Sequence, residues 1–230
     1  MTSPHILILD NSPRRLGAAW FGNWFRQLDC EVSTRHFQSL SRLARPDEFD
    51  ALVVSGSPAS AKEDKPWILK ELELIERADQ LGMPVLGVCF GSQLLARAYY
   101  GKEAVRRSPH AEFGWYSMSR TQEEDLLFDG MPDRFTSFQF HVEEVLPQPG
   151  MRLLATSDPV SVQAFRIDSK PVWGTQFHLE VTPRAGRDLL RKTRHVYEPH
   201  GFFYKELAAN ARPSEAAPRL FQNFLKAIDR

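Results

Sequence analysis

The stretch Pro84-Val-Leu-Gly-Val-Cys-Phe-Gly-Ser-Gln-Leu-Leu-Ala96 decides the fold expected of this chain. An apolar run of strand length ends at Cys89, and a helical pattern begins almost at once. Gly87 lies two residues before the cysteine and Gly91 two residues after it. A sharp turn from strand to helix crowds both of these positions, so the residues there must be small. The stretch therefore predicts a nucleophile elbow in which cysteine takes the place of serine.

The predicted elbow gives the Cys89 sulfur a reactive setting. The turn exposes the sulfur at the carboxyl edge of the sheet, where open α/β folds bind their ligands. It also places the sulfur at a helix N-terminus, which favours the thiolate, and it frees the N–H of Phe90 to donate to an oxyanion. A free cysteine is usually a small core residue, which is our interpretation of Cys30, but the paired glycines favour a catalytic Cys89.

Strand and helix patterns alternate through the first half of the chain. Apolar runs predict strands at 5–9, 30–37, 51–54 and 85–88. Helical spacing predicts helices at 14–28, 66–81 and 91–100. Because the strands are apolar on both faces, we expect a parallel sheet that helices cover on both sides.

The second half of the chain has a different pattern. Short strands are expected at 113–120, 134–141, 152–156, 160–167 and 172–176, and helical segments follow from Pro183 onward. We therefore predict an α/β fold, with an open, mostly parallel sheet, helices on both faces, a small second antiparallel sheet and extra C-terminal helices. No linker-like stretch divides the chain, so residues 1–230 are expected to form one domain.

The composition excludes several classes of protein. The 230 residues are 42% hydrophobic and 25% charged, which is ordinary for a globular protein. The 29 basic and 29 acidic side chains cancel, so charge gives no reason to expect binding to nucleic acid or a membrane. No apolar run approaches the ~20 residues of a membrane span. The N-terminal Met-Thr-Ser-Pro-His shows no signal peptide and the 2 cysteines form no disulfide framework, so a cytoplasmic protein is expected.

A cysteine nucleophile needs a base, and the base needs a third group that orients it. Among 7 histidines, His178 stands out because the strand at 172–176 leads into it and Glu180 follows two residues later. Residues i and i+2 of an extended chain share a face, so the carboxylate can reach the imidazole and fix its tautomer. A His-x-Glu pair alone is common, but with Cys89 it completes a Cys-His-Glu triad.

Two further features bear on the site. The turn Val53-Val-Ser-Gly-Ser-Pro58 ends a buried strand, so the N–H of Gly56 is a candidate second oxyanion donor. The alternative is a plain turn without a role in catalysis. A metal site built from His141, His178 and His195 is an alternative. Their spacings match no zinc pattern, so we expect no metal.

The two main motifs together carry a family resemblance. Gly87-Val-Cys-Phe-Gly-Ser-Gln93 and Gln176-Phe-His-Leu-Glu-Val-Thr182 resemble the class I (triad) glutamine amidotransferases, and in particular the amidotransferase domain of GMP synthetase and its stand-alone relatives. The resemblance runs from about residue 50 to residue 182 and returns at 220–225, which is similar to the closing helix of the family. It implies a flavodoxin-like amidotransferase fold without a cofactor.

The resemblance also implies roles for individual residues. Cys89 is then the nucleophile, His178 the general base and acid, Glu180 the orienter, and Gly56 and Phe90 the oxyanion hole. The residues implied in substrate binding are Gln93, His141, Val142 and Glu143.

Several positions depart from the family pattern. The segment around His141 resembles the His-Gly-Asp segment that holds the amino-acid end of glutamine, but Val142 stands where glycine is common and Glu143 where aspartate is usual. Leu179 replaces the usual proline and Ser92 the frequent histidine or methionine, and neither change touches the proposed chemistry. The Gly56 turn is Ser-Gly-Ser-Pro rather than Gly-Gly-Pro. The substrate contacts are therefore where differences are expected.

Three functions remain open at this stage. The first is hydrolysis of glutamine through a γ-glutamyl thioester, which supplies ammonia to a synthase partner. A partner is expected because the sequence shows no phosphate-binding glycine loop with which this chain could activate an acceptor with ATP. The second is a stand-alone γ-glutamyl peptidase, and the third is a regulatory binding module with a vestigial triad. The segment 184–218 is expected to be a helical insertion that covers the site or docks a partner, or else an added layer that completes the core.

Overall fold

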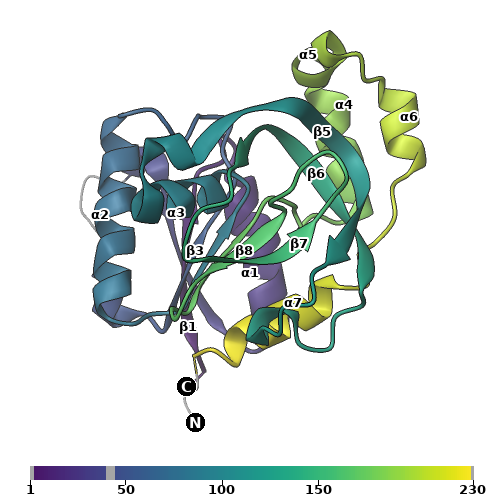
Figure 1. Ribbon diagram of the computed structural model, residues 1–230. Coiled ribbons are helices and arrows are strands. Elements are labelled where there is room, and N and C mark those ends of the chain that lie inside the picture. The colour runs from purple at the N-terminus through teal and green to yellow at the C-terminus, as the bar shows by residue number, and fades with distance from the viewer. Residues whose placement is uncertain (1–2, 40–44, 229–230) are drawn as a thin grey trace.

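The computed structural model describes residues 3–39 and 45–228, so the first two residues of the N-terminal stretch lie outside the described residues. The strands are β1 (His5–Asp10), β2 (Glu31–His36), β3 (Ala51–Val54), β4 (Val85–Val88), β5 (Val105–Arg120), β6 (Arg134–Val145), β7 (Met151–Thr156), β8 (Ala164–Ile167) and β9 (Val172–Thr175). Within the described residues these strands form one 9-stranded sheet in the order β2-β1-β3-β4-β9-β8-β7-β5-β6 (Figure 1).

The first half of this order is a parallel sheet, as the sequence predicts. Strands β2, β1, β3, β4 and β9 pair in parallel. Helix α1 (Leu16–Gln27) packs on one face, where Phe21 and Phe25 join a buried cluster. Helices α2 (Pro66–Gln80) and α3 (Phe90–Tyr100) cover the other face, where Ile68 and Leu94 join a second cluster. Helices on both faces therefore bury a sheet whose strands are apolar on both sides.

The second half of the order corrects one prediction. Strands β8, β7, β5 and β6 pair antiparallel, but they continue the same sheet from β9 and form no separate second sheet. The sheet is therefore parallel in one half and antiparallel in the other, rather than mostly parallel. The physical reason is that β9 pairs with β4 along one side and with β8 along the other, a choice of neighbours that strand patterns in a sequence do not reveal.

Strands β5 and β6 are also longer than expected. They pair from Val105 with Val145 to Ser119 with Arg134, whereas the sequence predicted strands only over 113–120 and 134–141. The end of the β5–β6 ladder that begins at Val105 carries charged residues, and the register of the pairing shifts between Arg107 and Glu112. A charged, irregular stretch has no alternation of apolar and polar residues, so it gives no strand signal.

The C-terminal part is helical, as expected. It contains α4 (Pro183–Lys192), α5 (Arg194–Tyr197), α6 (Tyr204–Ala209) and α7 (Ala217–Leu225). Helix α7 packs beside α1, where the ring of Phe221 stacks on Trp24 at a centroid distance of 5.1 Å. Helices α4 to α6 close a third cluster over β5 and β6, in which Leu190 and Tyr197 are fully buried.

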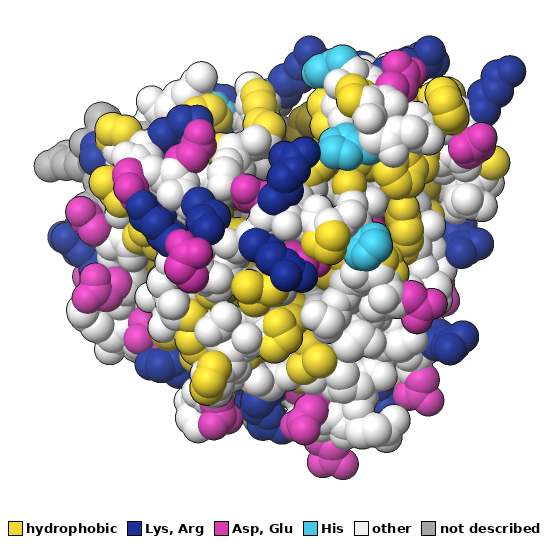
Figure 2. Space-filling view, turned by 45° about the horizontal axis from the view of Figure 1, so that its top comes forward, with side chains coloured by type: hydrophobic (Ala, Val, Ile, Leu, Met, Phe, Trp, Pro, Cys, Tyr) yellow, Lys and Arg dark blue, Asp and Glu magenta, His cyan; other side chains and the backbone are white. Residues whose placement is uncertain are grey.

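The helices α4 to α6 form a projecting lobe above the sheet (Figure 1). Figure 2 brings this side forward and shows Lys, Arg and His side chains gathered along its upper edge. The packing beneath this lobe agrees with an added layer that completes the core, and a lid or docking role for 184–218 stays a prediction. No helix within the described part of the chain combines the length and the apolar character needed to span a membrane.

Candidate active site

The turn between β4 and α3 has the geometry of an elbow. Cys89 sits at this turn with φ 55° and ψ −109°, a conformation that non-glycine residues rarely adopt. A Cβ on Gly91 would lie 2.0 Å from the carbonyl oxygen of Val54, and a Cβ on Gly87 would lie 2.5 Å from that of Gly91. Both glycines are therefore required because the helix passes so close to the sheet.

The strand β9 brings His178 and Glu180 to the same edge of the sheet. Gly174 pairs with Gly87, and the N–H of Cys89 donates to the carbonyl of Thr175 at 2.7 Å. His178 lies three residues beyond that carbonyl, and its own N–H donates to Phe138 at 2.8 Å. Because the carboxyl ends of neighbouring parallel strands meet at one edge, the cysteine and the histidine converge.

The pair of His178 and Glu180 forms as the sequence predicts, although the backbone differs from the expected one. Nδ1 of His178 lies 2.5 Å from Oε1 of Glu180, and both residues are buried. Strand β9 ends at Thr175, and Glu180 lies in a turn rather than in extended chain. The turn brings the carboxylate to the imidazole, so the contact does not depend on two side chains sharing the face of a strand.

The Gly56 turn, which follows β3, lies against the residues that follow β4 and β9. It follows β3, which pairs with β4. A Cβ on Gly56 would lie 3.0 Å from Cε1 of His178 and 3.6 Å from Cβ of Cys89. The Gly56 turn therefore packs directly against the cysteine and the histidine, on the side where a second oxyanion donor was expected.

The electrostatics favour a protonated imidazole. Burial by itself lowers the pKa of His178, but the charge of Glu180 and the adjacent Cys89 side chain outweigh burial and raise this pKa to about 10. The Cys89 sulfur is 3.9 Å from the carbonyl oxygen of Phe140. Phe90, the first residue of α3, has an N–H without an acceptor inside the helix, so the helix end presents a donor beside the sulfur.

Three of the residues expected to bind substrate contact one another, because Gln93 and His141 both lie within hydrogen-bond distance of the Glu143 carbonyl oxygen. Nε2 of Gln93 donates to the carbonyl of Glu143 at 3.0 Å and to Oε1 of Gln176 at 3.1 Å. Oε1 of Glu143 accepts a hydrogen bond from Ser60 at 2.7 Å. Val142 packs on the aromatic cluster beneath α4 to α6. Gln93 is therefore held by protein groups, and its role in substrate binding stays a prediction.

His141 does not meet the other two histidines of the metal alternative. Its Nε2 lies 2.8 Å from Oε2 of Glu112, whereas His178 is bound to Glu180 and His195 is exposed on α5. Within residues 3–39 and 45–228, no three His, Cys, Asp or Glu side chains are grouped to hold a metal ion. The structure therefore gives no support to the metal alternative.

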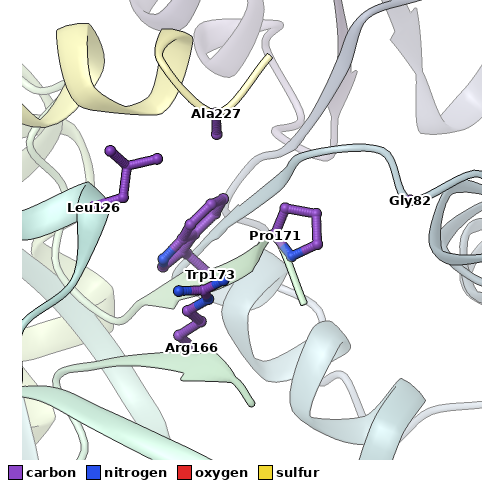
Figure 3. A pocket seen from close by; sticks show the side chains of 6 residues that line it. All are labelled: Gly82, Leu126, Arg166, Pro171, Trp173 and Ala227. Carbon is purple, nitrogen blue, oxygen red and sulfur yellow. The ribbon is translucent and has the colours of Figure 1, made fainter. Parts of the chain in front are cut away.

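A cavity of about 190 Å³ lies at the other end of the sheet (Figure 3). Gly82 and Pro171 line it, and they come just before β4 and β9, whereas Cys89 and His178 come after these strands. Trp173 and Arg166 also line it, and both donate to Asp125. This cavity is therefore at the amino edge of the sheet and separate from the candidate active site.

Sequence reasoning missed two polar groups of the site. Ser60 contacts Glu143, and Glu112 contacts His141. Glu112 could have been found from the sequence, because it lies an even number of positions from the fully buried Met118 and therefore shares its face of the strand. A charged residue on a buried face needs a partner. Ser60 lies in a loop, where no periodicity exists to indicate it.

Comparison with known proteins places the chain in a family. The family model of class I glutamine amidotransferases matches residues 21–195, so the chain belongs to the class I glutamine amidotransferase family. Among curated proteins it is similar to a subunit of the glutamine-hydrolysing GMP synthase of Thermococcus kodakarensis, at 37% identity over 121 residues. That match covers 51% of this chain and 62% of the relative.

Other relatives extend the match. The corresponding GMP synthase subunit of Archaeoglobus fulgidus is 31% identical over 157 residues, which covers 66% of this chain and 78% of the relative. Among solved structures, a glutamine amidotransferase from Thermotoga maritima superposes with a TM-score of 0.83 at 22% identity and 100% coverage of both chains. A glutamine amidotransferase from Methylobacillus flagellatus gives a TM-score of 0.75 at 21% identity, covering 99% of this chain and 95% of the other. These structures share the fold of this chain.

Proposed function

We propose that this protein hydrolyses the side-chain amide of glutamine with a Cys89-His178-Glu180 triad. The observation that carries the proposal is the packing of Gly56 against both Cys89 and His178 at one sheet edge. A nucleophile, a base and a candidate oxyanion donor then surround one point, as acyl transfer requires. The contact of Glu180 with His178 supplies the orienting group.

The first half of the reaction forms a thioester. The Cys89 thiolate attacks the amide carbon of glutamine, and the oxygen becomes an oxyanion that accepts from the N–H groups of Phe90 and Gly56. The protonated His178 gives its proton to the leaving nitrogen. The carbon–nitrogen bond breaks, ammonia leaves, and a γ-glutamyl group remains on the sulfur.

The second half returns the enzyme to its starting state. Neutral His178 takes a proton from water as the water oxygen attacks the thioester carbon. The carbon–sulfur bond then breaks to release glutamate and the Cys89 thiolate. Glu180 stabilises the imidazolium whenever it forms, which agrees with the raised pKa of His178. Gln93, His141, Val142 and Glu143 would hold the amino-acid end of the substrate beside this centre.

A synthase partner would receive the ammonia. The curated relatives are named as subunits of a glutamine-hydrolysing GMP synthase. We therefore propose transfer of ammonia in trans to a separate synthase chain, and a cytoplasmic location in which both chains meet.

A specific observation favours a second substrate class. The ring of Phe140, next to the site, packs on Phe113 at 5.2 Å, and Phe113 in turn contacts Phe202 of the α4 to α6 lobe at 5.3 Å. Phe113 itself is buried, but Phe140 and Phe202 are partly exposed, so their rings can contact a group attached to the γ-glutamyl amide. A γ-glutamyl peptidase is therefore the alternative activity.

One experiment tests both activities and the triad. Ammonia release from glutamine and amine release from γ-glutamyl dipeptides are measured for the wild type and for Cys89→Ala, His178→Ala and the control Cys30→Ala. We expect the first two variants to lose at least ~10³-fold in kcat and the control to keep full activity. Turnover by Cys89→Ala would exclude the mechanism. Faster release from dipeptides than from glutamine would favour the peptidase.

A further inference from the structure

An arginine without a partner lies opposite Glu143. Arg107 on β5 is exposed, and within residues 3–39 and 45–228 its guanidinium takes part in no hydrogen bond or ion pair. Across the β5–β6 ladder Arg107 pairs with Glu143. Residues directly opposite each other in an antiparallel pair have β-carbons about 5 Å apart, so the two side chains start out as neighbours. The mechanism proposed above gives this cation no role.

The ladder fixes the face of the sheet on which Arg107 lies. Side chains alternate along a strand, so Arg107 shares the face of Val105. Val105 and the opposite Val145 are both buried in the cluster that α2 and α3 cover. Arg107 therefore projects on the side of α3, the helix that begins directly after Cys89.

The preceding arginine lies on the other face and is bound there. Nη2 of Arg106 lies 2.6 Å from Oε1 of Glu144, whose side chain is only 5% exposed. The other oxygen of Glu144 accepts from Ser108 at 2.9 Å. Arg106 thus serves a structural ion pair, whereas Arg107 is available to an anion from outside the chain.

Glu143 is turned toward the candidate active site rather than toward Arg107. Its Oε1 accepts from Ser60 at 2.7 Å, in the loop that follows the Gly56 turn. Its carbonyl accepts from Nε2 of Gln93, and the N–H of Gln93 donates to the carbonyl of Cys89 at 3.1 Å. Glu143 is therefore linked to the nucleophile through one turn of α3. A carboxylate and a guanidinium lie side by side here without neutralising each other.

This arrangement matches the charges of a free amino acid. The α-carbon of glutamine carries an ammonium and a carboxylate group, and it lies three bonds from the amide carbon that the thiolate attacks. A guanidinium binds a carboxylate through two parallel hydrogen bonds, which fixes the orientation of the ligand as well as its charge. The β5–β6 pairing becomes irregular directly after Arg107, and such irregularities turn side chains toward active sites.

We propose that Arg107 is a specificity-determining residue that binds the α-carboxylate of a γ-glutamyl substrate, beside the α-ammonium group at Glu143. The inference rests on the function proposed above and adds the substrate class, which is glutamine or a γ-glutamyl compound with a free α-carboxylate. Glutamine whose α-carboxylate is blocked, as it is within a peptide chain, is then a poor substrate.

Two substrates that differ only in this group test the proposal. Ammonia release is measured at pH 7 from L-glutamine and from L-glutaminamide, in which a neutral amide replaces the α-carboxylate. We expect the wild-type kcat/KM for glutamine to exceed that for glutaminamide about tenfold or more. In Arg107→Gln the glutamine value should fall about tenfold, while the glutaminamide value changes less than about threefold. Arg107→Lys should lie between the two, because it keeps the charge but loses the paired hydrogen bonds.

Arg106→Gln is the matched control, since it removes the same charge from the adjacent position on the other face of β5. It should keep the wild-type ratio between the two substrates, and this ratio is independent of how much protein is folded. A wild type without preference for glutamine, a preference that Arg107→Gln retains, or a loss that Arg106→Gln shares would each overturn the proposal.

A binding measurement separates this proposal from the proposed function. L-glutamate and L-isoglutamine have no side-chain amide to hydrolyse, and isoglutamine lacks the α-carboxylate. By calorimetry the wild type should bind glutamate about tenfold or more tightly than isoglutamine, and Arg107→Gln should bind both equally. Equal binding of the two by the wild type, or binding of neither, overturns the inference. A wild type that shows this preference but releases no ammonia from glutamine contradicts the proposed function alone.

Discussion

A β-carbon placed on Gly56 would lie 3.0 Å from Cε1 of His178, although the two residues are more than a hundred positions apart in the chain. The contact exists because β3 and β9 flank β4 in the parallel half of the sheet, so the turns that follow them meet around Cys89. A glycine at this position leaves room for the imidazole. The distance indicates that an added β-carbon fits only if the imidazole gives way by a few tenths of an ångström.

Gly56→Ala should therefore fold normally and lose activity. The added methyl group must push the imidazole by a few tenths of an ångström, and a displaced base costs rate more than stability. We expect kcat for glutamine to fall about 10- to 100-fold, with a melting temperature close to that of the wild type. Steady-state kinetics and thermal unfolding of the same preparation check this, and wild-type kcat would contradict the site geometry.

Gly91→Ala should have the opposite outcome. Its β-carbon would lie 2.0 Å from the carbonyl oxygen of Val54, which is backbone and cannot move aside without separating α3 from the sheet. We expect a loss of about 3 kcal/mol or more in the free energy of unfolding, measured by urea denaturation. Gly56→Ala serves as the control for glycine replacement in general. Equal stability of the two variants would show that the elbow is less tightly packed than the structure indicates.

His178 should make stability depend on pH. Glu180 and Cys89 raise its folded-state pKa to about 10 against the opposing effect of burial, above the unfolded value of about 6.5. Protonation then favours the folded state, so this contribution is complete below pH ~6.5 and is lost as the pH rises toward the folded-state pKa. His178→Gln should therefore be destabilised most at pH 6 and progressively less toward pH 9.

Urea denaturation at several pH values measures this trend. The matched control is His195→Gln, because His195 is exposed on α5. The control should change the free energy of unfolding by less than ~0.5 kcal/mol at every pH. A deficit in His178→Gln that grows with pH would contradict the charge state assigned to this histidine.

Glu71 should make the protein less stable as the pH rises from about 4.5 to about 8. It is fully buried on α2, and burial raises its pKa to about 8, although a hydrogen bond from Asn11 opposes the rise. The folded state thus holds a proton that the unfolded state releases near pH 4.5. Stability should fall by up to about 1.4 kcal/mol per pH unit across the interval between these two values.

Glu71→Gln should remove this loss and be more stable than the wild type above pH 8. Glu73→Gln on the exposed side of the same helix is the control and should follow the wild-type curve. Free energies of unfolding from pH 5 to pH 9 decide the matter. Parallel curves for the wild type and Glu71→Gln would show that Glu71 is already ionised in the folded protein.

The sequence alone determined the elements whose signals are local. The apolar run into Cys89 with Gly87 and Gly91 predicted the elbow, and apolar strands alternating with helical patterns predicted the parallel half of the sheet and its covering helices. The motif around His178 predicted its partner Glu180. Each of these depends on periodicity or on steric demands within about ten residues, and such information is written along the chain.

Only the tertiary structure decided what depends on neighbours distant in sequence. The pairing of β9 with both β4 and β8 merged two expected sheets into one, and no property of Val172–Thr175 by itself selects those partners. The contact of Gly56 with His178 and the contact of Glu112 with His141 likewise follow from strand order and register. These relationships arise when separate strands are stacked in space, and the chain encodes them through the packing of the whole core rather than through any local pattern.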